Sequence, residues 1–238
     1  MNTANEINLG MPQAKPGAAS ASLAHVDIIR IVTPRTGRLV RVGTLHGGTA
    51  LVLIACHGYG MDVERFAARF EGLPAEVCVL CPEGLSRFYW GGFSGRPVAS
   101  WMTRAERLSE IDDFCIWMDQ VYALATETAP GARVAALGFS QGAATVMRWA
   151  DRVRPDLVGV VLWAGTPPED IAYSPRAYWD GLAKVVYWGD GDELVRWAAA
   201  EGRFEEVGLS FEVRKFAGAH EVVAGVVRVL VGEMLERW

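Results

Sequence analysis

Histidine and cysteine are scarce in this chain, whose 238 residues include four of each. The histidines are too few and too widely spaced to form a convincing set of metal ligands. Three of the cysteines lie in apolar runs, as is typical of reduced thiols buried as small hydrophobic side chains. Cys78 and Cys81 match a C-x-x-C motif, but residues three apart in a strand point to opposite faces, which argues against a redox pair. We therefore expect no metal, no cofactor and a reducing compartment, the cytoplasm.

Long apolar runs and clusters of basic residues are absent as well. No uninterrupted apolar run approaches the about 20 residues that a helix needs to cross a bilayer. The net charge is −5, and the 23 lysines and arginines are scattered along the chain. Proteins that bind nucleic acids usually concentrate positive charge on one surface. We therefore expect neither a membrane span nor a nucleic-acid partner.

The N-terminal residues 1–24 differ in composition from the rest. They are rich in Ala, Ser, Gly, Asn and Pro, and no basic start is followed by an apolar stretch. This composition predicts a disordered leader without a secretion signal. Residues 25–238 are predicted to form one domain, because a chain of this length can bury a single core.

Short apolar runs alternate with helical or loop sequence along the chain. The first two β-prone runs flank Arg35-Thr36-Gly37 and predict an N-terminal antiparallel hairpin. The later runs are typical of buried parallel strands. Together they predict an α/β fold with a mostly parallel eight-stranded sheet and helices on both faces. The expected strands are 26–34, 38–45, 50–56, 77–81, 133–139, 158–163, 184–188 and 210–216.

The clearest helical pattern starts at Thr103. Thr103 and Glu106 match a capping box, and apolar side chains then follow on one helical face as far as Ala125. Further helices are expected over 63–70, 141–150, 194–207 and 222–237.

The stretch Gly138-Phe139-Ser140-Gln141-Gly142 has the form of a nucleophile elbow. Its glycines let the backbone turn sharply enough to lift a serine above the end of a strand. A predicted strand precedes it and a predicted helix follows it, which is the context that the motif requires. We therefore predict that Ser140 is a nucleophile.

A serine hydroxyl needs a base to take its proton and an acid to orient that base, in the chain order Ser, acid, His for this type of fold. His220 is the only histidine after Ser140, and it follows the last predicted strand, where sites of parallel sheets gather. Asp190 and Asp192 lie between the two, after the penultimate strand. Spacing alone leaves both aspartates open as the acid.

The transition state also needs donors for a developing oxyanion. The backbone N–H of Gln141, directly after the nucleophile, is the expected first donor. The second is expected from residues 56–60, where a strand ends and two glycines let the backbone present an amide. His57 is a rival base, but it precedes Ser140, and its glycine neighbours favour a role as loop scaffold.

Four segments together resemble the phospholipase/carboxylesterase family of α/β-hydrolases, which includes acyl-protein thioesterases. They are His57-Gly58-Tyr59-Gly60, G-F-S-Q-G-A at 138–143, G-D-G-D at 189–192 with Val195, and Gly218-Ala219-His220. The resemblance implies the α/β-hydrolase fold and selects Asp192, because the second aspartate of G-D-x-D is the family's catalytic acid. It also places the oxyanion donors on Tyr59 and Gln141.

The chain departs from the family at several positions. Glu193 and Arg196 stand where the family often has prolines, and Met61 separates the glycine loop from Asp62. The opening hairpin also makes the N-terminus longer than the family's compact form. These differences leave the expected reaction class unchanged but put the substrate class in doubt.

The substrate pocket is expected to be open. Segment 164–183 is too short for a large cap domain over the site. The loop 83–101 carries aromatic residues among glycines, and such residues can line a pocket for an acyl group or an aromatic ester. The predicted pocket residues are Phe88, Tyr89, Trp90 and Trp101 from this loop, and Trp163 from the end of a strand.

These features predict a serine carboxylesterase or thioesterase that hydrolyses small or acyl-chain esters through a Ser-His-Asp triad and an acyl-enzyme. The expected partner is a small-molecule ester or thioester. A serine peptidase or a carbon–carbon bond hydrolase with the same triad is the alternative within hydrolases. A non-catalytic α/β-hydrolase relative is less consistent, because such proteins typically lose a triad member. The sequence leaves open the acyl group, the leaving group and whether the chain forms a homodimer.

Overall fold

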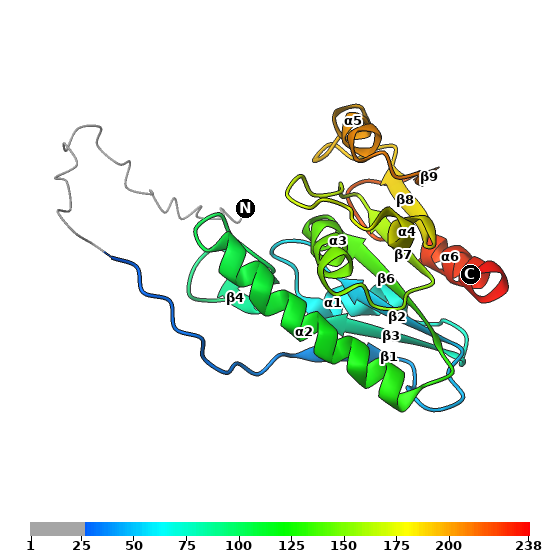
Figure 1. The fold of residues 1–238 in the computed structure, drawn as a ribbon, viewed down its shortest axis with the longest axis horizontal. Coiled ribbons are helices and arrows are strands. Elements are labelled where there is room, and N and C mark those ends of the chain that lie inside the picture. Colours follow the sequence, from blue (N-terminus) through cyan, green and yellow to red (C-terminus); the bar gives the residue numbers. More distant parts are fainter. Residues whose placement is uncertain (1–26) are drawn as a thin grey trace, which may run out of the picture. The chain divides into compact units, whose positions relative to one another are not determined.

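The computed structural model describes residues 27–238, so the predicted leader 1–24 lies outside the described residues. Residues 27–35 contain no helix or strand and belong to a separate unit from residues 36–238. All the regular secondary structure of the described residues lies in this second unit (Figure 1).

The second unit is built on a sheet of seven strands in the order β1-β3-β2-β6-β7-β8-β9 (Figure 1). Strand β1 pairs antiparallel with β3, and the other neighbouring pairs are parallel. The mostly parallel α/β sheet expected from the apolar runs is therefore confirmed. The strands are β1 (Leu39–Val42), β2 (Leu51–Cys56), β3 (Val77–Pro82), β6 (Arg133–Phe139), β7 (Gly159–Trp163), β8 (Ala183–Gly189) and β9 (Glu212–Phe216).

Helices cover both faces of the sheet because the central strands are apolar on both sides. In β2, Val52 and Ile54 belong to one core cluster, and Leu51 and Leu53 belong to the other. The first cluster is completed by α2, α3, α4 and α5, and the second by α1 and α6. The helices are α1 (Val63–Ala67), continued by the 3-10 helix η1 (Ala68–Phe70), α2 (Arg107–Thr128), α3 (Gln141–Val153), α4 (Arg176–Asp180), α5 (Trp197–Val207) and α6 (Ala224–Arg237).

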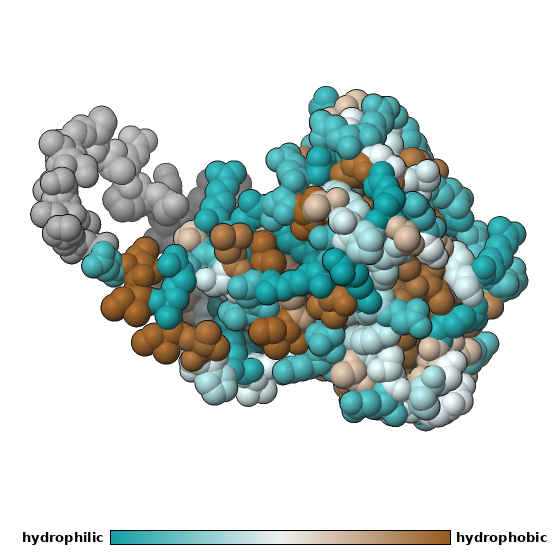
Figure 2. All heavy atoms as spheres, viewed as in Figure 1, coloured by the Kyte–Doolittle hydropathy of each residue, from teal (hydrophilic) through white to brown (hydrophobic). Residues whose placement is uncertain are grey.

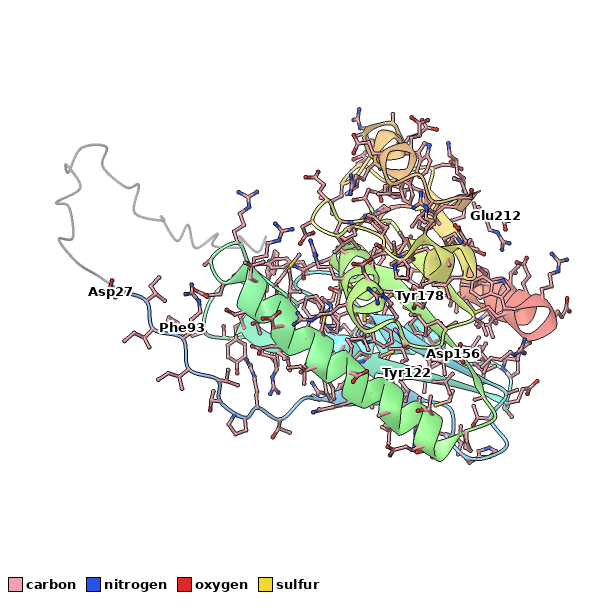
Figure 3. All side chains as sticks on the ribbon, in the orientation of Figure 1. Asp27, Phe93, Tyr122, Asp156, Tyr178 and Glu212 are labelled. Carbon is pink, nitrogen blue, oxygen red and sulfur yellow. The ribbon has the colours of Figure 1, made fainter. Side chains whose placement is uncertain are left out.

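Two tyrosines anchor the connection between α3 and β7. The hydroxyl of Tyr122 on α2 donates to the carbonyl of Asp156 and accepts from the N–H of the same residue (Figure 3). The hydroxyl of Tyr178 on α4 donates to the carbonyl of Pro155.

On the face shown in Figure 2, hydrophobic side chains lie among hydrophilic ones over α2, whose Leu108 and Ile116 are exposed. No helix within residues 27–238 is long and apolar enough to cross a membrane.

The cysteines are buried and unpaired, as expected. Cys78 and Cys81 on β3 belong to core clusters on opposite faces of the sheet, so they do not form a redox pair. Burial raises the pKa of the Cys81 thiol well above its usual value, and it raises the pKa of the Cys56 thiol in the same way.

The predicted N-terminal hairpin is wrong for the residues that the structure describes. Residues 27–34 form no strand, and β1 pairs with β3 in a register that sets Leu39 opposite Pro82. Residue 26 lies outside the described residues. The partner strand β3 is distant from β1 in the sequence, so a local β-prone pattern could not identify it. Because residues 27–34 add no strand, the sheet of the described residues has seven strands rather than the eight predicted.

The predicted start of the long helix is also wrong. Helix α2 begins at Arg107, and the hydroxyl of Thr103 donates to the Glu110 carboxylate at 2.9 Å. The backbone N–H of Thr103 donates to the same carboxylate. Thr103 therefore pairs with a side chain within the helix instead of capping its first turn.

The loop 83–101 is more ordered than predicted. It contains β4 (Ser86–Tyr89) and β5 (Pro97–Ser100), which form an antiparallel hairpin with Phe88 opposite Val98. A bridge between Met61 and Ala99 attaches this hairpin to the chain that follows β2. No cap domain covers the sheet within residues 27–238.

A buried ion pair joins α3 to the segment after β7. Arg148 is 5% exposed, and its Nε lies 3.1 Å from both carboxylate oxygens of Asp170. A second guanidinium nitrogen of Arg148 donates to the same carboxylate at 2.7 Å. Arg107 at the start of α2 also contacts Asp170, at 2.8 Å. The two arginines hold the pKa of Asp170 below its ordinary value, against the opposing effect of partial burial.

We expect Asp170→Asn to lower the free energy of unfolding by about 2–3 kcal/mol, because it leaves the buried Arg148 cation without its carboxylate. The matched control is Asp112→Asn. It breaks an exposed ion pair with Arg152, which lies on α3 as Arg148 does. The control should cost less than about 0.5 kcal/mol. Urea denaturation followed by tryptophan fluorescence measures both, and equal losses would contradict the prediction.

Candidate active site

The carboxyl ends of the parallel strands bring the predicted site residues to one edge of the sheet. Cys56 at the end of β2 lies opposite Gly138 of β6, and Phe139 lies opposite Trp163 of β7. The chain after β2 carries Tyr59, and the chain after β6 carries Ser140. The remaining residues follow β8 and β9, which pair with Gly189 opposite Phe216. This edge is where α/β sheets form their sites.

Ser140 lies in the sharp turn between β6 and α3. Its φ of 53° and ψ of −116° are sparsely populated for a residue other than glycine. Its backbone N–H donates to the carbonyl of Trp163 at 2.8 Å. A Cβ on Gly138 would lie 2.2 Å from the Gly142 carbonyl oxygen, and a Cβ on Gly142 equally close to the Cys56 carbonyl oxygen. Only glycine fits at both positions, so the strand–turn–helix context of the motif is present.

His220 and Asp192 meet beside this turn. The Nδ1 of His220 lies 2.7 Å from Oδ2 of Asp192. The other carboxylate oxygen accepts the backbone N–H groups of Leu194 at 3.0 Å and Val195 at 2.9 Å. The Asp192 side chain is completely buried, whereas Asp190 is exposed. Of the two aspartates that spacing left open, Asp192 is therefore the one that contacts the histidine.

The imidazole of His220 also packs against the elbow. Its ring centroid lies 4.9 Å from that of Phe139, the residue before Ser140. Within residues 27–238 the Ser140 hydroxyl forms no hydrogen bond. Since Asp192 engages Nδ1, the Nε2 of His220 is left to accept a proton. A hydrogen bond between a catalytic serine and its base is often long in the absence of substrate and tightens only when a substrate is bound.

Two backbone N–H groups at this edge have no acceptor within the described part of the chain. They belong to Gln141, the first residue of α3, and to Tyr59 in the glycine loop. The amides on either side of Tyr59 are engaged, because Gly58 donates to the Met61 sulfur at 3.3 Å and Gly60 donates to the Ala99 carbonyl at 2.9 Å. Unpaired amides at a helix start and in a glycine loop can stabilise an anion.

Comparison with known proteins identifies the fold. No family model matches the chain, and no curated protein does either. Acyl-protein thioesterase 2 from Zea mays superposes with a TM-score of 0.65 at 19% identity, over 84% of this chain and 100% of that chain. This chain has the α/β-hydrolase fold.

Two further solved structures are similar to this chain. The Bacillus cereus carboxylesterase has a TM-score of 0.56 at 17% identity, over 84% of this chain and 94% of that chain. A phospholipase/carboxylesterase from Dyadobacter fermentans has a TM-score of 0.56 at 16% identity, over 87% of this chain and 99% of that chain. These names match the family that the motifs resemble, and at these identities the likeness concerns the fold.

In this chain His57 is part of the scaffold of the glycine loop. It is fully buried, its Nδ1 lies 2.7 Å from the Gly58 carbonyl, and its Nε2 accepts the N–H of Gly84 at 3.0 Å. Burial lowers the pKa of His57 to about 4. The ring is therefore neutral at pH 7 with both nitrogens engaged, in agreement with the expected role as loop scaffold.

Three aromatic side chains gather beside the loop that carries the Tyr59 amide. Tyr59, Phe88 and Trp90 have ring centroids 5.7–6.2 Å apart. Trp90 is 61% exposed and lies so close to Gly60 that a Cβ there would come within 2.5 Å of the indole. Tyr89, between Phe88 and Trp90 in the chain, is also exposed. Of the predicted pocket residues, Phe88 and Trp90 thus lie next to the glycine loop, and Tyr89 is exposed on the same hairpin.

The other two predicted pocket residues are corrected by the structure. Trp101 and Trp163 are 1% and 0% exposed, so neither side chain can contact a substrate at the surface. The indole N–H of Trp101 donates to the His57 carbonyl at 2.8 Å, and that of Trp163 donates to the Glu221 carbonyl at 2.8 Å. Both brace the loops of the site. An indole with an apolar body and one donor can line a pocket or pack in the core, so the sequence could not distinguish a pocket residue from a buried one.

A hollow of about 340 Å³ lies next to the loop that carries Asp192. Neither Ser140 nor His220 lines it. Its walls are formed by Trp188, Gly189, Asp190, Gly191, Asp192, Glu193, Arg196, Trp197 and Lys215. The hollow therefore includes the aspartate of the candidate site but neither the serine nor the histidine.

The stability of the protein should depend on pH through His57. The pKa of this side chain is about 4 in the folded chain and about 6.5 when unfolded, so the unfolded state binds more protons between these values. The free energy of unfolding should therefore fall as the pH is lowered from about 6.5 to about 4, by up to about 3 kcal/mol from this group.

Denaturant unfolding measured at several pH values tests this dependence. His57→Gln, which removes the titrating group, should flatten the decline between pH 6.5 and 4. His46→Gln is the matched control, because His46 is exposed, and it should leave the decline unchanged. A decline as steep in His57→Gln as in the unmodified protein would contradict the prediction.

Proposed function

We propose that this α/β-hydrolase is a serine carboxylesterase or thioesterase. The observation that carries the proposal is the 2.7 Å hydrogen bond between His220 and the buried Asp192, beside the strained turn that holds Ser140. A serine, an aspartate and a histidine in this chain order and at the ends of these strands are what acyl transfer needs.

In the proposed reaction the Ser140 hydroxyl oxygen attacks the carbonyl carbon of an ester or thioester. The Nε2 of His220 takes the hydroxyl proton, and Asp192 stabilises the resulting imidazolium. The carbonyl oxygen becomes an oxyanion that accepts the N–H groups of Tyr59 and Gln141. Collapse of this intermediate expels the alcohol or thiol, which leaves with the proton from His220, and Ser140 remains acylated.

Water completes the cycle by the same route. His220 takes a proton from a water molecule whose oxygen attacks the acyl carbon, and the oxyanion forms again at the same two amides. When this second intermediate collapses, the acid is released and Ser140 recovers its proton from His220. The chain needs no group besides these residues for the hydrolysis.

The exposed aromatic cluster supports a substrate with an apolar acyl part. Phe88 and Trp90 contact Tyr59, whose amide is one of the proposed oxyanion donors. An acyl chain that leaves the carbonyl carbon in this direction would cover apolar ring surface. Since no cap domain closes the site within residues 27–238, small esters and longer acyl chains can both reach the serine.

We expect Ser140→Ala to reduce hydrolysis of p-nitrophenyl acetate and butyrate by at least about 10³-fold, because the nucleophile is lost. The unmodified protein should be phosphonylated on Ser140 by a fluorophosphonate probe, as mass spectrometry of the labelled peptide would show. Ser94→Ala, at an exposed position of the β4–β5 hairpin, is the control and should retain full activity. Retained activity in Ser140→Ala, or a protein that hydrolyses no ester and takes no label, would refute the proposal.

Replacement of Asp192 and replacement of Asp190 by asparagine should have very different effects on kcat. Asp192→Asn should lower kcat by about 10³–10⁴-fold, because the amide no longer holds His220 in the tautomer that accepts the serine proton. Asp190→Asn should change kcat by less than about 3-fold, because this exposed side chain does not contact His220. Steady-state kinetics on one ester compares them, and equal losses would contradict the assignment of Asp192.

A further inference from the structure

The proposed mechanism uses only the backbone N–H of Gln141, but the side chain of this residue is fully engaged. Its Oε1 accepts the backbone N–H of Trp101 at 3.1 Å and lies 3.5 Å from the Ser100 hydroxyl, which donates to the Met102 carbonyl at 3.1 Å. Its Nε2 donates to the carbonyl of Met102 at 2.9 Å. The carboxamide therefore ties the first residue of α3 to the chain that leaves β5.

The same short stretch holds the glycine loop, which carries the other proposed oxyanion donor. Ala99 accepts the N–H of Gly60 at 2.9 Å and donates its own N–H to the carbonyl of Met61 at 3.0 Å. The indole N–H of Trp101 donates to the carbonyl of His57 at 2.8 Å. Tyr59 lies between residues anchored on both sides, so the position of its amide is set by residues 99–101.

Residues 99–102 thus lie between the two halves of the proposed oxyanion hole and are bonded to both. Ala99, Ser100 and Trp101 are buried, so water does not compete for these hydrogen bonds. The chain also packs tightly, because a Cβ on Gly84 would lie 2.5 Å from the Ser100 carbonyl oxygen. A rigid connector of this kind can hold two donors at a constant separation.

We propose that the Gln141 side chain is a positioning residue that sets the separation of the Tyr59 and Gln141 amides through residues 99–102. The inference rests on the proposed serine hydrolase function. Donors of an oxyanion hole act at about 2.7–3.1 Å from the oxyanion. A displacement of about 1 Å can cost about 10²-fold in rate. Removing the carboxamide of this side chain keeps both N–H groups but releases the constraint between them.

The effect is expected in the transition state rather than in substrate binding. The negative charge on the carbonyl oxygen develops only during the reaction, so misplaced donors weaken the transition state more than the ground state. Gln141→Met, which has a similar volume and no amide, should lower kcat by about 10–100-fold and change KM by less than about 2-fold. Its affinity for a trifluoromethyl ketone, which forms a tetrahedral adduct on serine, should fall by the same factor as kcat/KM.

Trp101→Phe cuts the other arm of the connector, because the smaller phenyl ring lacks the donor to the His57 carbonyl, whereas the backbone N–H that binds Gln141 remains. It should lower kcat in the same way. The double variant should lose little more than either single variant, since both changes interrupt one connection. Additive losses in the double variant would overturn the inference, because they indicate two independent local effects.

Thr145→Val is the matched control. The Thr145 hydroxyl donates to the Gln141 carbonyl at 3.2 Å within α3, so this change removes a buried hydrogen bond to the same residue without touching the connector. It should leave kcat and inhibitor affinity unchanged. Denaturant unfolding of every variant separates a loss of stability from a loss of positioning, and Trp101→Phe provides the test if Gln141→Met does not fold.

The outcomes distinguish this inference from the proposed function. If the unmodified protein neither hydrolyses esters nor reacts with a fluorophosphonate, the proposed function fails. If it does both, and Gln141→Met keeps kcat within about 3-fold, the positioning role alone is refuted. Complete final labelling of Ser140 in Gln141→Met, together with the lower kcat and the weaker ketone binding, would support the role.

Discussion

The close approach of α3 to the ends of β2 and β6 is the constraint on which the rest of the site depends. A Cβ on Gly138 would collide with the backbone of α3, and a Cβ on Gly142, within α3, would collide with the Cys56 carbonyl at the end of β2. This contact brings the turn at Ser140 against the start of the glycine loop. Backbone packing between neighbouring parallel strands therefore positions Ser140 and the two unpaired amides, and the strain at Ser140 is supported by that packing.

Around this centre, buried side chains with polar groups connect segments that are distant in the chain. His57 binds Gly84, Trp101 binds His57, and Trp163 binds Glu221, which follows His220. Each bond satisfies a backbone group that would otherwise be buried without a partner. The loops of the site are thus held by the core side chains beneath them, and within residues 27–238 no cap domain contributes to positioning the proposed catalytic residues.

Much of the architecture followed from local patterns. The apolar runs of β2, β6 and β7 are buried on both faces, and such runs are recognisable because no polar position interrupts them. The patterns failed where the partner was distant. The β-prone run before β1 predicted a hairpin, but β1 pairs with β3 instead. Thr103 was predicted to cap a helix, but its hydroxyl donates to the Glu110 carboxylate. The aromatic residues of the 83–101 loop looked alike in sequence, but Trp101 is buried and Trp90 is exposed.

The sequence by itself determined the elbow at Ser140 and the order of serine, acid and histidine, because these depend on residue type and on neighbours close in the chain. Which aspartate contacts His220 is visible only in the tertiary structure. The N–H of Gly191 binds the carbonyl of Gly218, and the N–H of Asp192 binds that of Gly189, so the two loops lie together with Asp192 turned inward and Asp190 at the surface. The connection from Gln141 through residues 99–102 to the glycine loop likewise depends on three separate segments, which no local pattern relates.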